Sequence, residues 1–218
     1  MTKLTLVTLF LALFLLFTLF SYTVAKERWQ RQDFDTTVKL QDHIPRKFDN
    51  YFSYFSLIGS AEVTIGLAGI CAFLYLFKKR FKAFLAWLLI IPASAFEVYG
   101  KLVVFHPAPP EFFHRNSLTA SLPSFYIHTN YSYPSGHMTR TIFLVTVFLL
   151  ITISSSRGFF FKLIVCLALL IFAFLMMLTR IYLGEHWLSD VIGGSLLGLS
   201  TGFLASIFVI KKNYANIG

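Results

Sequence analysis

The sequence predicts an all-α membrane protein with six transmembrane helices, and two observations support this fold class. First, 56% of the 218 residues are hydrophobic, only 13% are charged, and the mean hydropathy is +0.69, which is typical of membrane proteins. Second, the apolar residues form long segments, and a hydrocarbon core of about 30 Å is crossed by roughly 20 helical residues. Six segments have about this length: 4–25, 51–77, 81–105, 137–153, 159–182 and 187–210.

The first segment follows Lys3 and ends in Thr-Val-Ala, which loosely resembles the cleavage site of a secretory signal. Its apolar part is longer than the roughly 7 to 15 residues of a signal peptide, so we interpret it as a retained membrane anchor. The basic turn 78–82 separates the second and third segments, and the turn 154–162 separates the fourth from the fifth. Gly184 provides a turn before the last segment.

Basic residues are distributed unevenly between the two sets of connections. Lys3, the turns 78–82 and 154–162, and the C-terminal tail carry nine basic residues and no acidic one. The loop 26–50 carries six basic and five acidic residues, and the loop 106–134 carries one of each. Because cytoplasmic connections are enriched in Lys and Arg, we expect both termini in the cytoplasm and the loops 26–50 and 106–134 outside.

The chain shows no internal repeat and no low-complexity tract, so we expect residues 1–218 to form a single domain. The net charge is +9, but no basic patch alternates with exposed aromatic residues, and nucleic acid is therefore not an expected partner. We expect an integral protein of a bacterial cell membrane, in contact with membrane lipids. No cofactor and no required protein partner is predicted.

Charged and titratable residues gather at the predicted outer ends of the apolar segments. They are Glu97, Lys101, His137, Arg140, Arg180, Glu185, His186 and Asp190. Any one of them could reach the interface, cap a helix or form an ion pair, but their gathering on one side favours a functional site there. A transporter is the alternative from another class, although its polar groups would lie near the bilayer midplane between inverted repeats.

The stretch 179–190, TRIYLGEHWLSD, predicts an activated histidine. We expect the last helix to begin near His186, which places His186 and Asp190 four residues apart on one face. A carboxylate that holds one imidazole nitrogen leaves the other free to act as a nucleophile. Arg180 makes an anionic partner more plausible, because its guanidinium matches phosphate oxygens. The His–Asp spacing alone would also fit a metal half-site or a structural hydrogen bond, but without a third ligand we predict no metal site.

The stretch 133–140, YPSGHMTR, predicts a helix start that binds an anion. We expect the backbone N–H groups of Ser135, Gly136 and the first turn to face outward, where the helix dipole favours negative charge. Ser135 is expected to cap this helix and to contact a phosphate oxygen. His137 is placed to protonate a leaving group. The alternative is an ordinary Ser cap followed by His and Arg at the membrane interface.

Together these motifs resemble those of the phosphatidic acid phosphatase type 2 superfamily, which contains membrane lipid phosphatases and is related to vanadium haloperoxidases. Its second motif, P-S-G-H, matches residues 134–137. Its third, S-R-x5-H-x3-D, matches 179–190 with Thr179 in the Ser position. Its first, K-x6-R-P, begins at Lys101 and has Pro109 in register, but Ala108 occupies the Arg position.

The resemblance implies a metal-independent lipid phosphatase whose site faces outside. His186 would attack phosphorus to form a phosphohistidine, Asp190 would orient it, and His137 would protonate the leaving group and then activate water. The phosphoryl oxygens would be neutralised by Lys101, Ser135, Gly136 and Arg180. The substrate would be phosphatidic acid, phosphatidylglycerol phosphate, or a polyprenyl phosphate or diphosphate. Transfer of the phosphoryl group to another lipid stays an alternative of the same fold.

Ala108 leaves the predicted phosphate site one cation short. We expect Arg140 to replace it, because Arg140 lies three residues after His137 on the same helical face and can reach the phosphate directly or through Ser135. Weaker candidates are His106 and Arg115. The alternative is a structural ion pair of Arg140 with Glu62, Glu97 or Glu185. Glu97 itself lies four residues before Lys101, which predicts an ion pair between them.

Overall fold

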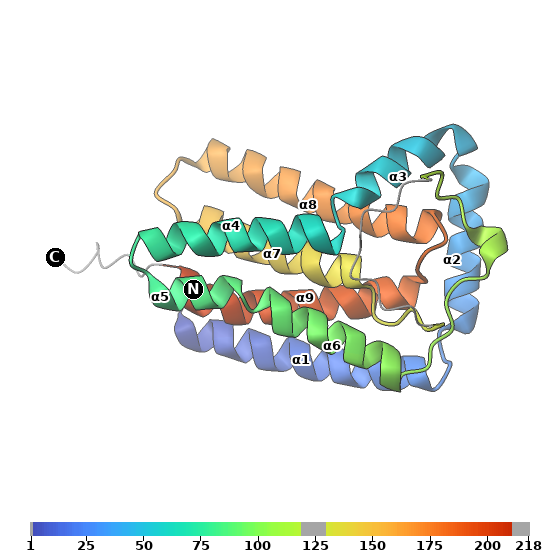
Figure 1. Ribbon diagram of the computed structural model, residues 1–218, viewed down its shortest axis with the longest axis horizontal. Helices are drawn as coiled ribbons and strands as arrows, with labels where there is room; N and C mark the ends of the chain where they lie inside the picture. The colour runs from blue at the N-terminus through green and yellow to red at the C-terminus, as the bar shows by residue number, and fades with distance from the viewer. Residues whose placement is uncertain (1, 119–129, 211–218) are drawn as a thin grey trace.

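The computed structural model describes residues 2–118 and 130–210, which form a bundle of long helices with one more helix lying across its end (Figure 1). The described residues contain six apolar helical segments long enough to cross a membrane, which confirms the predicted fold class. The membrane-crossing helices are α1 (Lys3–Ala25), α3 (Asp49–Leu57) with α4 (Ala61–Phe77), α5 (Phe81–Trp87) with α6 (Ile90–Val103), α7 (Gly136–Ser154), α8 (Phe159–Tyr182) and α9 (Leu188–Val209).

Two segments predicted as continuous helices, 51–77 and 81–105, are each broken in two. The break in 81–105 is explained by Pro92, which has no backbone N–H to donate and whose ring would clash with the Leu88 carbonyl in a continuous helix. The chain therefore ends α5 at Trp87 and begins α6 at Ile90. At the break in 51–77, Ser60 caps α4 by accepting a hydrogen bond from the Val63 N–H at 3.4 Å.

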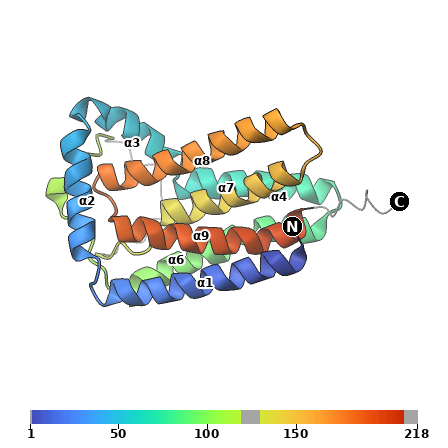
Figure 2. The same ribbon diagram turned by 180° about the vertical axis from the view of Figure 1, so that it is seen from behind.

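The predicted outer loop 26–50 contains a helix that hydropathy did not indicate, α2 (Gln30–His43). It runs across the end of the bundle, close to perpendicular to the long helices (Figure 2). Its buried residues are Asp33 and Thr37. The Gln41 side chain donates to the backbone carbonyls of Phe113 at 2.7 Å and Tyr182 at 2.8 Å. These bonds join α2 to the 3-10 turn η2 (Glu111–Phe113) and to the end of α8. The short turn η1 (Arg46–Phe48) then leads into α3.

The start of α1 and the end of α9 lie together at the end of the bundle opposite α2 (Figures 1 and 2). The basic turn between α4 and α5 and the turn between α7 and α8 lie at that same end. This arrangement agrees with an even number of crossings, while the side of the membrane on which each end lies stays a prediction. Lys211 and Lys212 of the predicted basic tail, and residues 119–129 of the predicted loop 106–134, lie outside the described residues.

Helices α7 and α9 form the centre of the bundle. In the most apolar 18 residues of these helices 67% and 61% of the residues are buried, against 11–33% in the other spans. Their closest contact runs along Gly194, Gly198 and Gly202, which recur every four residues on α9. A Cβ atom at Gly194 would collide with the Ser135 carbonyl, and one at Gly198 with the Thr139 carbonyl. The missing side chains therefore allow the two backbones to touch, as small residues do in membrane helix pairs.

The other helices pack around this pair. One apolar cluster joins Trp87 of α5 to Phe143 and Val147 of α7. A second joins Phe17 of α1 to Tyr133, whose hydroxyl forms a 2.8 Å hydrogen bond with the Ser21 hydroxyl of α1. Burial raises the pKa of the Tyr133 phenol, so this group stays neutral in the contact. The first span is thereby tied to the segment that leads into α7.

The glycine contact generates a test. We expect Gly198→Leu to lower the free energy of unfolding by about 2 kcal/mol or more, because the larger side chain must push α7 away from α9. The measurement is thermal unfolding in detergent, followed by tryptophan fluorescence. Gly66→Leu is the matched control, since a Cβ at Gly66 of α4 meets nothing within 4 Å. Equal unfolding temperatures for the two variants would contradict this account of the core.

Candidate active site

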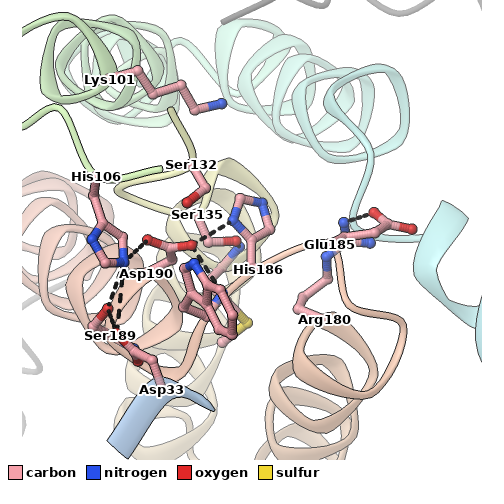
Figure 3. Close-up of polar contacts among 12 residues, drawn as sticks. Asp33, Lys101, His106, Ser132, Ser135, Arg180, Glu185, His186, Ser189 and Asp190 are labelled. Atoms are coloured by element: carbon pink, nitrogen blue, oxygen red, sulfur yellow. Dashed lines mark hydrogen bonds and ion pairs between the residues drawn. The ribbon is translucent and has the colours of Figure 1, made fainter. Parts of the chain in front are cut away.

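The eight residues predicted to take part in catalysis or to bind phosphate all lie at the end of the bundle that α2 crosses. Lys101 comes from α6, Arg180 from α8 and Asp190 from α9. His186 lies in the connection between α8 and α9. The remaining four come from the start of α7 or its cap: Ser135, Gly136, His137 and Arg140. In Figure 3, Asp190 lies between His106 on one side and His186 on the other.

The predicted contact between His186 and Asp190 is present, with Nδ1 of the ring 3.3 Å from Oδ2 of the carboxylate. The helix begins later than predicted, at Leu188, because Asp190 Oδ2 caps it by accepting the Trp187 backbone N–H at 2.9 Å. His186 is therefore not on the helical face that we expected. One carboxylate oxygen thus contacts both the imidazole and the start of α9, so the dyad and the helix cap share one atom.

The connection from α8 to α9 is held by a tight turn around Arg180. The N–H groups of Glu185 and His186 donate to the Arg180 carbonyl at 3.3 and 3.2 Å. Gly184 has φ +67°, and its Cα lies against the Phe113 backbone, so a side chain there would be both strained and blocked. The turn brings His186 back over the helix end that carries Arg180.

Ser135 caps α7 as predicted, with its hydroxyl 3.5 Å from the Met138 N–H. The expectation that the Ser135 backbone N–H faces outward is wrong, because it donates to the Asp190 carbonyl at 3.0 Å. The close approach of α7 and α9 brings that carbonyl within reach. Among the described residues, the amides of Gly136 and His137 remain as candidates for an anion at this helix start.

Glu97 links two of the predicted phosphate-binding cations. Its Oε1 lies 2.7 Å from Lys101 Nζ, which confirms the predicted pair, and its Oε2 lies 3.2 Å from Arg140 Nη1. Glu97 is 5% exposed and Arg140 is 7% exposed. A Cβ at Gly136 would meet the Glu97 carboxylate at 2.6 Å, so the start of α7 lies directly against this ion-pair cluster. Arg140 thus forms one of the pairs considered as its alternative role, and its contact with phosphate stays a prediction.

Arg180 is buried and held by neighbours from two elements. Its guanidinium donates to the Ser56 hydroxyl of α3 and to the Glu185 carboxylate. Asn116 donates to the other oxygen of Glu185 at 2.7 Å. Thr179, which occupies the Ser position of the motif, directs its hydroxyl at the Met176 carbonyl of its own helix at 2.8 Å. Arg180 is therefore fixed in orientation at the site.

The charges of this cluster act on both histidines. Arg180, Arg140 and Lys101 lie within electrostatic range of the His137 and His186 rings. Burial and then the positive charge of Arg180 and Lys101 hold the pKa of His186 well below its ordinary value. A neutral ring at neutral pH keeps a lone pair, which a nucleophile requires. His137 packs against the break between α3 and α4, where a Cβ at Gly59 would meet its Cδ2 at 2.9 Å.

The sequence analysis did not predict Asp33 of α2 and named His106 only as a weaker candidate for the missing cation. Both lie on the side of Asp190 that faces away from His186 (Figure 3). The only sequence signal for Asp33 is an acidic residue near Phe34 and Leu40 in an amphipathic stretch. Arg115, a weaker candidate for the missing cation, lies elsewhere, because it donates to the Gln41 carbonyl at 3.0 Å. Ala108 is exposed and lines a cavity that also contacts His106.

Comparisons with known proteins identify a family and similar folds. The model of the PAP2 superfamily matches residues 94–214, more than half of the chain. A transmembrane PAP2-type phosphatidylglycerolphosphate phosphatase from Bacillus subtilis has a TM-score of 0.72 at 20% identity, over 90% of this chain and 93% of that one. LpxE from Aquifex aeolicus has a TM-score of 0.54 at 25% identity, over 80% of this chain and 94% of that one. No curated protein matches the chain.

The lowered pKa of His186 can be measured directly. In protein labelled with 15N-histidine, we expect the His186 ring to stay neutral when the pH falls from 7 through 6, below the ordinary midpoint of about 6.5. The resonance is identified by its loss in His186→Gln. Arg180→Gln should raise the pKa of His186, whereas Arg115→Gln, which removes a charge that does not act on this ring, should leave it unchanged. Protonation of the ring near pH 6.5 in the unsubstituted protein would overturn this description.

Proposed function

Because the chain belongs to the PAP2 superfamily, we propose that it is an integral membrane lipid phosphatase that hydrolyses a lipid phosphomonoester or diphosphate without a metal ion. The observation that carries the proposal is the buried pair of His186 and Asp190, 3.3 Å apart, beside Lys101, Arg140 and Arg180. A neutral imidazole oriented by a carboxylate and surrounded by cations is suited to attack a phosphoryl group. Residues 1–218 act as one domain in this proposal.

In the first step, His186 Nε2 attacks phosphorus while Asp190 accepts the hydrogen bond of the Nδ1–H. The bond between phosphorus and the lipid oxygen breaks, and a phosphohistidine forms. His137, protonated once the bound phosphate offsets the surrounding cations, transfers a proton to the departing lipid oxygen. The leaving group then departs as a neutral alcohol, or as a lipid monophosphate when the substrate is a diphosphate.

In the second step, water attacks the phosphohistidine. His137, now neutral, takes a proton from that water, and the bond between phosphorus and His186 breaks. Inorganic phosphate leaves and both histidines return to their starting protonation states. The same group therefore serves first as general acid and then as general base.

The developing charge on phosphorus is stabilised by cations and backbone donors that are already oriented. We assign this role to Lys101, Arg140, Arg180, the Ser135 hydroxyl and the backbone N–H of Gly136. Donors fixed before the reaction cost no reorganisation in the transition state. Because Glu97 contacts both Lys101 and Arg140, a phosphate would share these cations with a carboxylate.

The substrate class follows from the membrane location and the family. We propose phosphatidylglycerol phosphate, phosphatidic acid, or a polyprenyl phosphate or diphosphate, and the Bacillus subtilis neighbour supports including the first. We place the protein in a bacterial cell membrane with the site outside, because the basic turns 78–82 and 154–162 lie at the opposite end of the bundle.

The test is phosphate release from this panel of lipids by purified protein in detergent. We expect release by the wild type to persist in excess chelator and to be inhibited by vanadate, and we expect His186→Ala to abolish it while thermal unfolding is unchanged. With a radiolabelled lipid diphosphate, whose leaving phosphate depends less on a general acid, His137→Ala should accumulate acid-labile, base-stable label on the protein, because loss of the general base slows hydrolysis of the phosphohistidine more than its formation. Activity of His186→Ala within a few fold of the wild type would disprove the assignment of the nucleophile.

Arg140 requires a separate test, because it contacts Glu97. We expect Arg140→Ala to lower turnover about a hundredfold and to weaken inhibition by vanadate, as the loss of one donor to a transition-state oxyanion does. Ala108→Arg added to this variant should restore part of the turnover. Arg140→Ala also leaves Glu97 short of a partner, so Arg140→Ala with Glu97→Gln separates the loss of a phosphate contact from the cost of a buried charge.

If Arg140 serves only as a structural partner, Arg140→Ala will lower the unfolding temperature, and the double variant will recover both stability and full turnover. That result would remove Arg140 from the phosphate site. Retention of the catalytic loss in the stable double variant would assign Arg140 to the reaction.

A further inference from the structure

Three buried polar groups lie on the side of Asp190 that faces away from His186 (Figure 3). His106 Nε2 is 3.7 Å from Asp190 Oδ1, 3.6 Å from Asp33 Oδ2 and 3.3 Å from the Ser189 hydroxyl. Asp33 is 2% exposed, His106 is 7% exposed, and Ser189 and Asp190 are fully buried. The proposed mechanism does not use Asp33, His106 or Ser189, although His106 contacts the residue that orients its nucleophile.

The hydrogen bonds around Asp33 decide which atom of His106 carries a proton. Asp33 accepts the Ser189 backbone N–H at 2.7 Å and the Ser189 hydroxyl at 2.8 Å. The Ser189 hydroxyl proton is therefore committed to Asp33, and its oxygen can only accept from His106. Every neighbour of Nε2 in this cluster is thus an acceptor: a hydroxyl oxygen and two carboxylate oxygens. A lone pair on Nε2 would be repelled by all three, so this nitrogen carries a hydrogen.

Two carboxylates in one buried cluster need positive charge or donors nearby. His106 faces Asp33 from α2, Asp190 from α9 and the Tyr133 ring from the segment before α7. Lys101 of α6 also acts on Asp190. Burial raises the pKa of Asp33 to about 6, against the opposing effect of the Ser189 hydrogen bonds. The clustering of acidic groups here is costly, which argues for a role of His106 beyond filling space.

The two oxygens of Asp190 have different neighbours. Oδ2 contacts His186 Nδ1 and the Trp187 N–H. Oδ1 is buried, and His106 Nε2 lies 3.7 Å from it. The Ser132 hydroxyl is a second polar group that acts on this carboxylate. Rotation of the carboxylate would exchange the oxygens and disturb the contact with His186. The partial positive charge at His106 Nε2, 3.7 Å from Oδ1, opposes that rotation.

We propose that His106 is a positioning residue of this enzyme: its Nε2, which donates to the Ser189 hydroxyl, lies 3.7 Å from Asp190 Oδ1 and favours the carboxylate orientation in which Oδ2 stays on His186, while Asp33 of α2 faces the same nitrogen. The inference rests on the proposed function, because positioning has meaning only if His186 is the nucleophile. It assigns to α2 a part in the chemistry, since Asp33 Oδ2 lies 3.6 Å from His106 Nε2 and Asp33 accepts the Ser189 N–H in the first turn of α9.

This role predicts a specific kinetic pattern. His106 contacts Asp33, Ser189 and Asp190 on the side of Asp190 away from His186, so its loss should lower kcat and leave KM and inhibition by vanadate unchanged. The loss should be about tenfold or more, as for removal of an outer hydrogen-bond partner of a functional histidine. His106 also lines a cavity of about 430 Å³ beside Phe34 and Trp187, through which small molecules can reach the position of the missing ring.

The experiment measures kcat, KM and the vanadate inhibition constant for His106→Ala and His106→Gln, with His114→Ala as the matched control. His114 is an exposed histidine in the same connection between α6 and α7. We expect both His106 variants to lose kcat at constant KM, His114→Ala to match the wild type, and added imidazole to restore part of the activity of His106→Ala. Asp33→Asn, which keeps an acceptor for Ser189 but removes the charge that holds His106, should lower kcat in the same way.

A double-mutant cycle then separates positioning from general stability. Because His106 acts through Asp190, adding His106→Ala to Asp190→Asn should change the residual rate by less than twofold, measured with radiolabelled substrate. An equal fold loss in both backgrounds, or wild-type kcat in a folded His106→Gln, would overturn the proposal. The wild type is assayed first: if it releases phosphate from no lipid in the panel, the proposed function fails, whereas an active wild type with active His106 variants refutes only the role of His106.

Discussion

The contact between α7 and α9 is the constraint on which the rest of the site depends. Gly194 and Gly198 let the backbone of α7 approach so closely that the Ser135 N–H bonds the Asp190 carbonyl at 3.0 Å. The helix start proposed to bind phosphate and the carboxylate that orients the proposed nucleophile are thus joined through main-chain atoms. Main-chain contacts vary less in length than contacts between long side chains, so this arrangement holds the two halves of the site in register.

Around this centre, the buried charges occur in sets that combine both signs. Glu97 contacts Lys101 and Arg140, and Glu185 contacts Arg180. Such pairing limits the cost of keeping charges away from water, although it adds little net stability. In the proposed function the pairing also has a kinetic meaning, since a phosphate dianion would compete with carboxylates for the same cations. This competition would weaken ground-state binding of the substrate, while the additional charge on phosphorus in the transition state would still meet oriented donors.

Local sequence spacing was sufficient for the spans, for the Glu97 and Lys101 pair, and for the contact of His186 with Asp190. The contact is made by a different local structure than we predicted, because the cap of α9 excludes His186 from the helix.

Contacts between distant parts of the chain could not be predicted from local spacing. Asp33 meets Ser189 across more than 150 residues, and nothing in the pattern of α2 indicates its partner. Hydropathy also hid α2, since only one narrow face of that helix is buried. Likewise, the bond of the Ser135 amide to Asp190 depends on helix packing, which motif spacing does not encode.

The order of the helices along the chain has a consequence for biogenesis. The first span, α1, packs against the last, α9, and α9 is also the central partner of α7. During synthesis the earlier spans therefore enter the bilayer before their main partner exists, and their aromatic faces must be covered by lipid or by the insertion machinery until the last span arrives. Closure of the bundle is then a late, long-range event after insertion. A chain truncated before α9 would carry Lys101, Arg140 and Arg180 but lack Asp190, which contacts His186 in the complete bundle.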